Sequence, residues 1–146
     1  MPGLILKLRA HEQILVNGVV MQNGDRNARL IVKTPDAKIL RLRDAIHPDE
    51  VDTPVKRVCY IAQLVVAGEA DPQEAVAQLA SGISQLRDAL DGHAATAHLH
   101  EAALALEDRN FYTVMRCLRR VLPTEAQLLG RAPCRAEGGR QRSLRA

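Results

Sequence analysis

Histidine and cysteine are the residues of this 146-residue chain that could hold a metal ion or act as a nucleophile. The five histidines include His98 and His100, which are two positions apart and therefore point to different sides of a helix. No two histidines have the spacing of four that puts a ligand pair on one helix face. Cys59 and Cys117 fall in apolar stripes of predicted helices, where cysteine packs as a small apolar residue. We therefore expect no metal, no cofactor and no reactive thiol.

Sequence motifs of the common enzyme classes are missing. No glycine-rich phosphate loop follows a predicted strand, and neither G-x-S-x-G nor H-E-x-x-H occurs. Cys59, Cys117 and Cys134 are far apart and form no CxxC pair, which is typical of reduced thiols in the cytosol. Lys7 and Arg9 interrupt the first apolar run too early for a signal segment, and no run approaches the roughly 20 residues of a membrane helix. We expect a cytoplasmic protein that is not an enzyme and does not enter a membrane.

Basic side chains are the other chemically useful set, and they are unevenly distributed. Residues 1–46 carry eight Lys and Arg against four Asp and Glu, a net charge of +4. Residues 47–130 have a net charge of −5, and residues 131–146 one of +4. Polyanions would prefer the two ends, so the three parts suggest different partners. With one Phe, two Tyr and no Trp, extensive stacking of bases on aromatic rings is excluded.

The stretch from His11 to Ile46 contains most of the basic residues of the N-terminal part, residues 1–46. Its local sequence pattern predicts strands. Short β-branched runs are separated by Asn17-Gly18, Asn23-Gly24 and Thr34-Pro35-Asp36. Gly and Asn supply the positive φ angles of tight turns, and Pro fixes φ for the first turn position. Asn17-Gly18 and Asn23-Gly24 are thus two candidate hairpin turns in a small antiparallel β module.

Alternation in the first strand (residues 4–9) and the last strand (residues 38–43) sorts the side chains onto two faces. The leucines are predicted to face the core: Leu4, Leu6, Leu8, Leu40 and Leu42. The cations are predicted to face outward: Lys7, Arg9, Arg41 and Arg43. Such rows are usually solubilising charge on the outer face of a sheet, and contact with a polyanion is the alternative.

Two helices with clear starting signals follow the β module. Thr53 can cap the first helix, and Pro54 suits its first position because its missing N–H would be unpaired there anyway. This helix ends before Gly68. Asp71 can cap the second helix, which contains Gly82 at a cost of about 1 kcal/mol relative to Ala.

Two more helices are predicted before the chain loses its periodicity. The third covers about residues 94–107, and the fourth begins near Phe111. Because Pro123 cannot donate to the helix ladder, we expect a break or kink over residues 119–123 and one or two further turns through Leu129. The basic segment after this point has no periodicity and is predicted to be disordered.

The predicted fold is therefore α+β, with an N-terminal antiparallel β module of four to five strands and a C-terminal bundle of about four helices. The β module spans residues 1–47 and the helical region spans residues 48–130. The basic tail spans residues 131–146.

Five segments carry motifs that are specific in combination. They are Ile14-Leu15-Val16-Asn17-Gly18-Val19-Val20, Asn23-Gly24-Asp25-Arg26, Leu42-Arg43-Asp44-Ala45-Ile46, Asp52-Thr53-Pro54-Val55-Lys56-Arg57 and Asn110-Phe111-Tyr112. Over residues 4–130 the chain thereby resembles the flagellar biosynthesis repressor FlbT of alphaproteobacteria. The resemblance implies a cytoplasmic post-transcriptional regulator that acts on the 5′ untranslated region of flagellin mRNA, represses translation and promotes mRNA decay. It also implies the small regulator FlaF as a functional counterpart, and in some species a positive effect on flagellin production.

Residues 4–46 also resemble, more weakly, the carbon storage regulator CsrA at their first and last strands. Arg9 falls on the second of two arginines in the first strand of that family, while the first falls on Leu8. Glu12 matches its G-E turn, where His11 replaces the Gly, and Arg43 falls on its RNA-contacting arginine. That family is a strand-exchanged β dimer that binds GGA-containing loops in mRNA leaders.

The two resemblances turn the basic side chains of the β module into candidate RNA-binding residues. These candidates are Lys7, Arg9, Arg26, Arg29, Arg41 and Arg43. Contacts of such side chains with an RNA backbone would supply affinity and register, whereas sequence choice requires contacts with base edges.

Two functions stay open at this point. One is an mRNA-binding repressor of flagellin synthesis. The alternative is a protein-interaction adaptor or chaperone-like flagellar assembly factor, which would bind FlaF or flagellin through its acidic helices and affect RNA indirectly. A homodimer formed through the β module is compatible with both.

Overall fold

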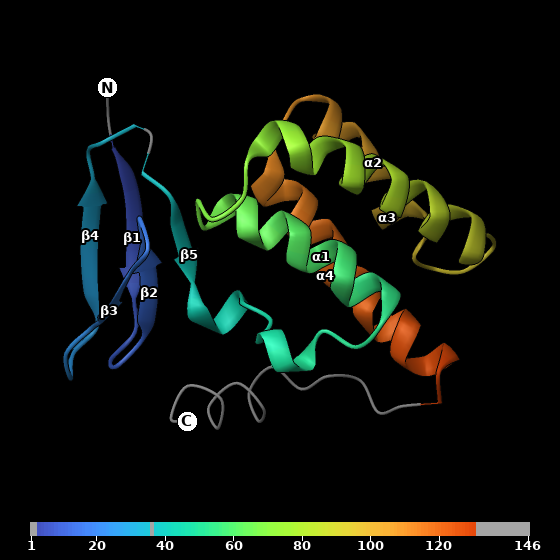
Figure 1. The fold of residues 1–146 in the computed structure, drawn as a ribbon. Coiled ribbons are helices and arrows are strands. Elements are labelled where there is room, and N and C mark those ends of the chain that lie inside the picture. Colours follow the sequence, from blue (N-terminus) through green and yellow to red (C-terminus); the bar gives the residue numbers. More distant parts are fainter. Residues whose placement is uncertain (1–2, 36, 131–146) are drawn as a thin grey trace. The chain divides into compact units, whose positions relative to one another are not determined.

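The computed structural model describes residues 3–35 and 37–130, and the chain divides into two compact units, Met1–Ala45 and Ile46–Ala146. The described part of the first unit contains five strands, and that of the second contains four α-helices (Figure 1). The α+β prediction is therefore confirmed. The predicted tail, residues 131–146, lies outside the described residues.

All strand pairs of the first unit are antiparallel. A two-stranded sheet has the order β1-β4, and a three-stranded sheet has the order β3-β2-β5 (Figure 1). The strands are β1 (Leu4–Leu8), β2 (Gln13–Val16), β3 (Val19–Gln22), β4 (Ala28–Val32) and β5 (Ile39–Arg41).

Only one of the two expected hairpin turns forms. Asn17 and Gly18 have φ angles of 50° and 86°, as a two-residue turn between paired neighbours requires, and β2 pairs directly with β3 across them. The prediction for Asn23-Gly24 is wrong, because the following strand β4 pairs with β1 instead of β3. Strand β1 buries Leu6 and Leu8, and the half-buried Val32 of β4 packs against the same core, which favours this long-range pairing.

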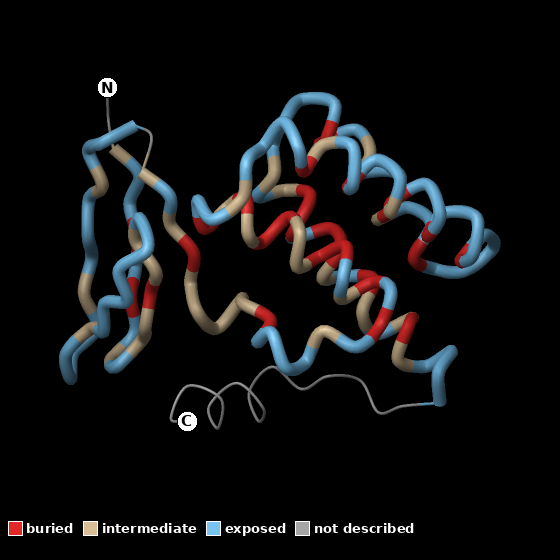
Figure 2. Tube along the Cα trace, in the orientation of Figure 1, coloured by how far each residue is buried: buried red, intermediate tan, exposed pale blue. Residues whose placement is uncertain are grey.

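The alternation predicted for the outer strands holds in part. Leu6, Leu8 and Leu40 are buried as expected, whereas Leu4 at the sheet end is exposed. The predicted last strand is too long, since β5 ends at Arg41 and the next three residues form the 3-10 helix η1 (Leu42–Asp44). The core of this unit is small and centres on Leu6, Leu8 and Ile14 (red in Figure 2). The half-buried residues Val16, Val32 and Ile39 pack against it.

The helices begin where the capping signals predict. Thr53 Oγ1 accepts a hydrogen bond from the Lys56 backbone N–H, and Asp71 accepts one from the Gln73 N–H. A further short 3-10 helix, η2, spans Pro48–Glu50 before them. The α-helices are α1 (Pro54–Val66), α2 (Pro72–Ala89), α3 (Thr96–Glu107) and α4 (Phe111–Leu128).

Of the break or kink expected over residues 119–123, the break does not occur, because α4 continues through Pro123 to Leu128. Pro123 is exposed, whereas Val121 and Glu125 on either side of it are buried. Packing of these neighbours therefore holds the helix together across the missing ladder bond. No described helix combines the length and the apolar character that crossing a membrane would require.

The four helices pack through small residues and buried hydrogen bonds. Helix α4 packs against both α1 and α3, and α2 packs against α1 and α3. A Cβ atom at Gly82 would lie 2.7 Å from Val58 Cγ2, so this glycine allows α1 and α2 to approach closely. Glu125 near the end of α4 accepts hydrogen bonds from Thr53 Oγ1 (2.5 Å) and the Val55 N–H (2.9 Å). Its carboxylate thus caps the start of α1, where negative charge is favourable.

Candidate nucleic-acid interface

One pair of candidate cations lies on the outer face of the β1-β4 sheet. Lys7 is directly opposite Arg29 in the register, and Ile5 is directly opposite Ile31. Because Leu6 and Leu8 turn to the core, alternation turns Lys7 and Ile5 outward, together with their cross-strand partners. Lys7 and Arg29 are exposed, and neither makes an ion pair with another described residue. The result is a short face with two cations beside two exposed isoleucines.

A second pair, Arg9 and Arg26, lies on two loops that are connected by hydrogen bonds from the Asn23 side-chain amide. Asn23 Nδ2 donates to the Arg9 carbonyl (2.7 Å) and to the Arg26 carbonyl (2.8 Å). Three more hydrogen bonds join these loops: His11 N–H to the Gly24 carbonyl, Asn23 N–H to the Glu12 carbonyl, and Ala10 N–H to Asn27 Oδ1. Both arginine side chains are exposed, and neither makes an ion pair within the described part of the chain. Asn23 therefore joins the backbones of two exposed arginines that are 17 positions apart.

The remaining pair, Arg41 and Arg43, gathers around one carboxylate. Arg41 Nη1 donates to Glu12 Oε2 (2.7 Å) and to the Lys7 carbonyl (3.1 Å). Arg43 Nε lies 3.7 Å from the same Glu12 oxygen. The Glu12 side chain is 7% exposed and that of Arg41 is 20% exposed, so this is a partly buried ion pair rather than two outward-facing cations.

Glu12 is held in its charged form by this arrangement. Burial is the largest single influence and would raise the pKa of Glu12, but it is outweighed by the Arg9 backbone N–H, which donates to Oε1 (2.8 Å), and by the Arg41 and Arg43 guanidinium groups. The net effect lowers the pKa of Glu12 below its ordinary value of 4.5. At neutral pH the carboxylate therefore neutralises part of the charge of Arg41 and Arg43.

The six predicted residues thus fall into two groups. Lys7, Arg9, Arg26 and Arg29 are exposed cations available to a polyanion. Arg41 and Arg43 surround Glu12 and support the fold, although Arg43 keeps 39% of its side chain exposed. The strand alternation indicated the Lys7 position correctly. Nothing local in the sequence indicated the partnership of Glu12 with Arg41, because the two residues are 29 positions apart.

The described residues other than these six cations show no reactive thiol and no metal-binding cluster. Cys59 and Cys117 are buried, as predicted, and burial raises the pKa of the Cys59 thiol to about 12. Burial also raises the pKa of Cys117, with Glu101 contributing in the same direction. Both thiols are therefore protonated and poorly nucleophilic near neutral pH. No group of three or more metal-binding side chains gathers within the described residues.

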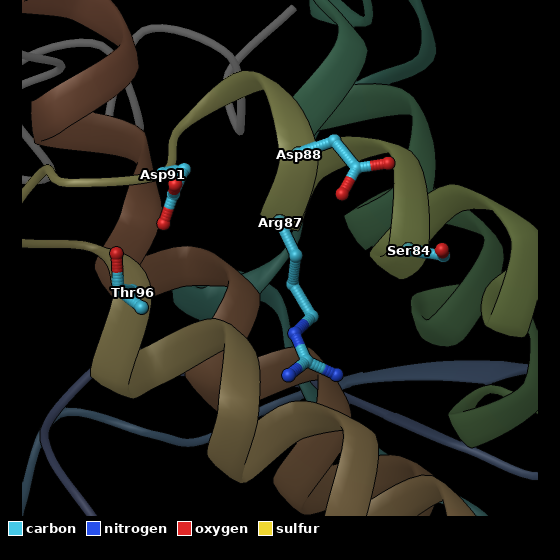
Figure 3. Close-up of a pocket in the computed structure, with 5 residues that line it drawn as sticks. All are labelled: Ser84, Arg87, Asp88, Asp91 and Thr96. Atoms are coloured by element: carbon cyan, nitrogen blue, oxygen red, sulfur yellow. The ribbon is translucent and has the colours of Figure 1, made fainter.

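A polar pocket lies where α2 ends and α3 begins (Figure 3). Its lining residues are Ser84, Arg87, Asp88, Asp91 and Thr96. All five are exposed, and the two carboxylates oppose the single guanidinium for any charged ligand. The Thr96 hydroxyl already donates to the backbone carbonyls of Leu90 and His93. The pocket therefore lacks the desolvated polar groups that an active site needs.

The fold and the site define a class of protein: a small basic β unit with exposed cations, joined to an acidic helical unit. The family model of flagellar protein FlbT matches residues 4–129. The chain therefore belongs to the FlbT family, as its motifs suggested.

Curated relatives agree with this assignment. The chain is similar to the flagellum biosynthesis repressor protein FlbT of Caulobacter vibrioides, with 24% identity over 87% of this chain and 89% of the relative. It is 28% identical to the probable flagellum biosynthesis repressor protein FlbT of Brucella anthropi, over 88% of this chain and 84% of the relative. The probable repressor FlbT 1 of Bradyrhizobium diazoefficiens is 38% identical, over 49% of this chain and 48% of the relative. No solved structure matches the chain.

Proposed function

We propose that this protein regulates flagellin synthesis after transcription, by binding the 5′ untranslated region of flagellin mRNA in the cytoplasm. Binding would repress translation and promote decay of the message. Membership of the FlbT family and the names of its relatives, flagellum biosynthesis repressors, support a regulatory role in flagellar synthesis. The RNA contact is our own assignment.

The observation that carries the RNA contact is the cross-strand pair of Lys7 and Arg29. Both are exposed, and both project from directly opposite positions of the paired strands β1 and β4. Cross-strand partners lie roughly 5 Å apart at Cβ, so two long cations can reach neighbouring phosphates of one strand. Arg9 and Arg26 add two further cations on the loops that Asn23 joins. Each phosphate contact releases counterions, so affinity should fall with salt.

Loss of the pair tests the assignment directly. We would measure binding of the full chain to a flagellin mRNA leader and to a scrambled RNA of equal length, by fluorescence anisotropy at several salt concentrations. Lys7→Ala/Arg29→Ala should weaken leader binding at least about tenfold and reduce the slope of log affinity against log salt by about 1.4. Salt-independent binding, or unchanged binding by the double variant, would end the proposal.

The helical unit supplies the matched control. Arg57→Ala/Arg120→Ala removes the same charge from exposed positions of α1 and α4 and should leave leader binding close to that of the original chain. Equal losses in both double variants would mean that only net charge matters. A chain ending at Gly130 separates the contribution of the basic tail. If the leader and the scrambled RNA bind equally and the tail carries the binding, the interaction is nonspecific attraction of a polyanion.

The acidic helical unit motivates a second candidate, in which the protein acts as an adaptor for another flagellar protein. Residues 47–130 carry a net charge of −5, which favours a basic partner surface. Immobilised full-length protein would be tested for capture of purified FlaF and of flagellin. Capture that survives Lys7→Ala/Arg29→Ala while RNA binding is lost would separate the partner surface from the Lys7-Arg29 face, and no capture of either protein would end this candidate.

A further inference from the structure

The outer face of the β1-β4 sheet carries two isoleucines that the fold leaves uncovered. Ile5 and Ile31 are directly opposite in the register, and their exposed fractions are 53% and 57%. Gly3, just before β1, adds no side chain over them, although a Cβ atom there would lie 3.1 Å from Ile31 Cγ2. A sheet with one solvated face normally turns polar side chains outward, so this isoleucine pair departs from the usual alternation.

Cations flank the isoleucine pair. Lys7 and Arg29 are the next outward-facing pair, two positions along each strand, and residues so spaced are about 7 Å apart. Lys33 comes directly after β4 and is also exposed. None of the three makes an ion pair with another described residue. The face therefore offers positive charge beside a compact apolar surface. A nucleotide has the complementary order, because its charged phosphate lies next to a base with flat apolar faces.

We propose that this face binds RNA as an unpaired strand, an inference that rests on the function proposed above and names the form of RNA bound. Bases would lie on Ile5 and Ile31, and phosphates would contact the flanking cations. In an RNA duplex the base faces are stacked inside, and the surface consists of phosphates, 2′-hydroxyls and base edges. A duplex would therefore leave the isoleucine pair without an apolar partner, whereas an unpaired base covers it. In a chain so poor in aromatic rings, these aliphatic side chains replace the usual stacking surface.

The size and charge of the face favour a nucleotide over a protein as its occupant. A stable protein interface buries roughly 800 Å² on each partner, which is more than four side chains supply. One or two unpaired bases are enough to cover two isoleucines. The cations beside the pair attract phosphates and disfavour a basic partner.

Annealing the RNA to its complement tests which form is bound. Fluorescence anisotropy would compare binding of the full chain to the flagellin mRNA leader and to the same leader annealed along its whole length to a complementary strand. The leader should bind at least about tenfold more tightly at equal salt, although the duplex carries more phosphates. Equal affinity for the two forms would overturn the proposal. The proposed function would still stand if Lys7→Ala/Arg29→Ala lost leader binding, whereas no leader binding by the original chain would end both.

Removal of the apolar surface tests the isoleucine pair itself. Ile5→Thr/Ile31→Thr keeps β-branched side chains that suit a strand, and it should weaken leader binding about fivefold. Duplex affinity and the salt slope should stay unchanged, because no phosphate contact is lost. Val19→Thr/Val20→Thr is the matched control, since these residues of β3 are 59% and 58% exposed, and it should bind the leader as the original chain does. Circular dichroism would confirm that both variants are folded.

Two outcomes of this comparison contradict the proposal. Equal losses in the isoleucine and valine variants would mean that exposed apolar surface acts without regard to place. If the isoleucine variant bound RNA normally but lost capture of FlaF or flagellin, the face would belong to a protein partner.

An added ring tests the placement by a gain in affinity. Ile31→Tyr offers a base a flat stacking surface, so leader affinity should rise about threefold to tenfold while duplex affinity stays the same. Val20→Tyr places the same ring at an exposed position of β3 and should change neither affinity. A rise in leader affinity for both variants, or for neither, would overturn the placement of bases on the isoleucine pair.

Discussion

The two units of the molecule differ in how far they bury their apolar side chains. In the helical unit, α4 alone buries Val114, Met115, Leu118 and Val121 completely. Among the described residues of the helical unit, four large hydrophobic side chains are exposed: Leu104, Tyr112, Leu128 and Leu129. The shorter β unit exposes more of them: Leu4, Ile5, Val19, Val20, Met21, Leu30 and Ile31. The helical unit is therefore built around its own extensive core, whereas the β unit leaves much of its apolar surface exposed.

The two units also differ in how much their structure depends on polar contacts. In the β unit, Asn23 and Glu12 hold loops and strand ends around a thin core, and both use partners distant in sequence. In the helical unit, Glu125 adds a buried polar contact to a core that is already extensive. We therefore expect apolar truncation to dominate the energetics of the helices and polar substitution to dominate those of the strands.

The largest effect is expected from Leu118→Ala in the helical core. Leu118 is completely buried, so truncation leaves a cavity and should reduce the free energy of unfolding by about 2–5 kcal/mol. Urea unfolding followed by helical circular dichroism measures this loss. Leu104→Ala makes the same chemical change on α3, where the side chain is 50% exposed, and should cost far less. Similar losses for both leucines would contradict the conclusion that burial in the helical core, and not leucine truncation as such, sets the cost.

Glu125→Ala should have the next largest effect. It leaves the Thr53 hydroxyl and the Val55 N–H without their acceptor in a buried position, at a cost of about 2–3 kcal/mol. Glu125→Gln keeps one acceptor oxygen and should cost less than Glu125→Ala. The same urea titration distinguishes them. If Glu125→Ala were as stable as the original chain, the start of α1 would not depend on this carboxylate.

Local signals in the sequence predicted the features that depend on neighbouring residues. The caps at Thr53 and Asp71 and the turn at Asn17-Gly18 rely on hydrogen bonds or φ angles within a few positions, and all three occur as expected. The outward direction of Lys7 followed from simple alternation of the strand.

Features that depend on distant residues were missed. The β1-β4 pairing joins residues 20 to 28 positions apart, and it overrode the local turn signal of Asn23-Gly24. Arg41 was expected to face outward, but its partner Glu12 is 29 positions away and no periodicity connects them. Pro123 normally ends a helix, yet tertiary packing around its buried neighbours kept α4 intact. Tertiary contacts therefore decided each of these positions against the local preference.

A smaller effect is expected from Asn23→Asp in the β unit. The Asn23 amide donates to the carbonyls of Arg9 and Arg26, and a carboxylate oxygen in its place would repel both, costing about 1–3 kcal/mol. Asn27→Asp introduces the same charge, but Asn27 acts as an acceptor from the Ala10 N–H, a role that a carboxylate retains. Hydrogen exchange of β-unit peptides should therefore rise in Asn23→Asp and change little in Asn27→Asp. Equal exchange in the two variants would show that added charge, and not the lost donor, controls the loops.

Acidification should produce the smallest effect, and in the β unit it should act through Glu12. The folded pKa of Glu12 is lowered, so its contribution to stability is fully present above the unfolded value near 4.5 and is lost as pH falls through the lower folded value. Protonation removes the charge that Arg41 and Arg43 surround, while Arg41 keeps its hydrogen bond to the Lys7 carbonyl. Exchange of amides in the β unit should therefore rise below pH 4.5 in the original chain. In Glu12→Gln, which has no carboxylate to titrate, this part of the pH dependence should vanish. The same acid response in both proteins would assign it to other carboxylates and would mean that the Glu12 ion pair adds little to the β unit.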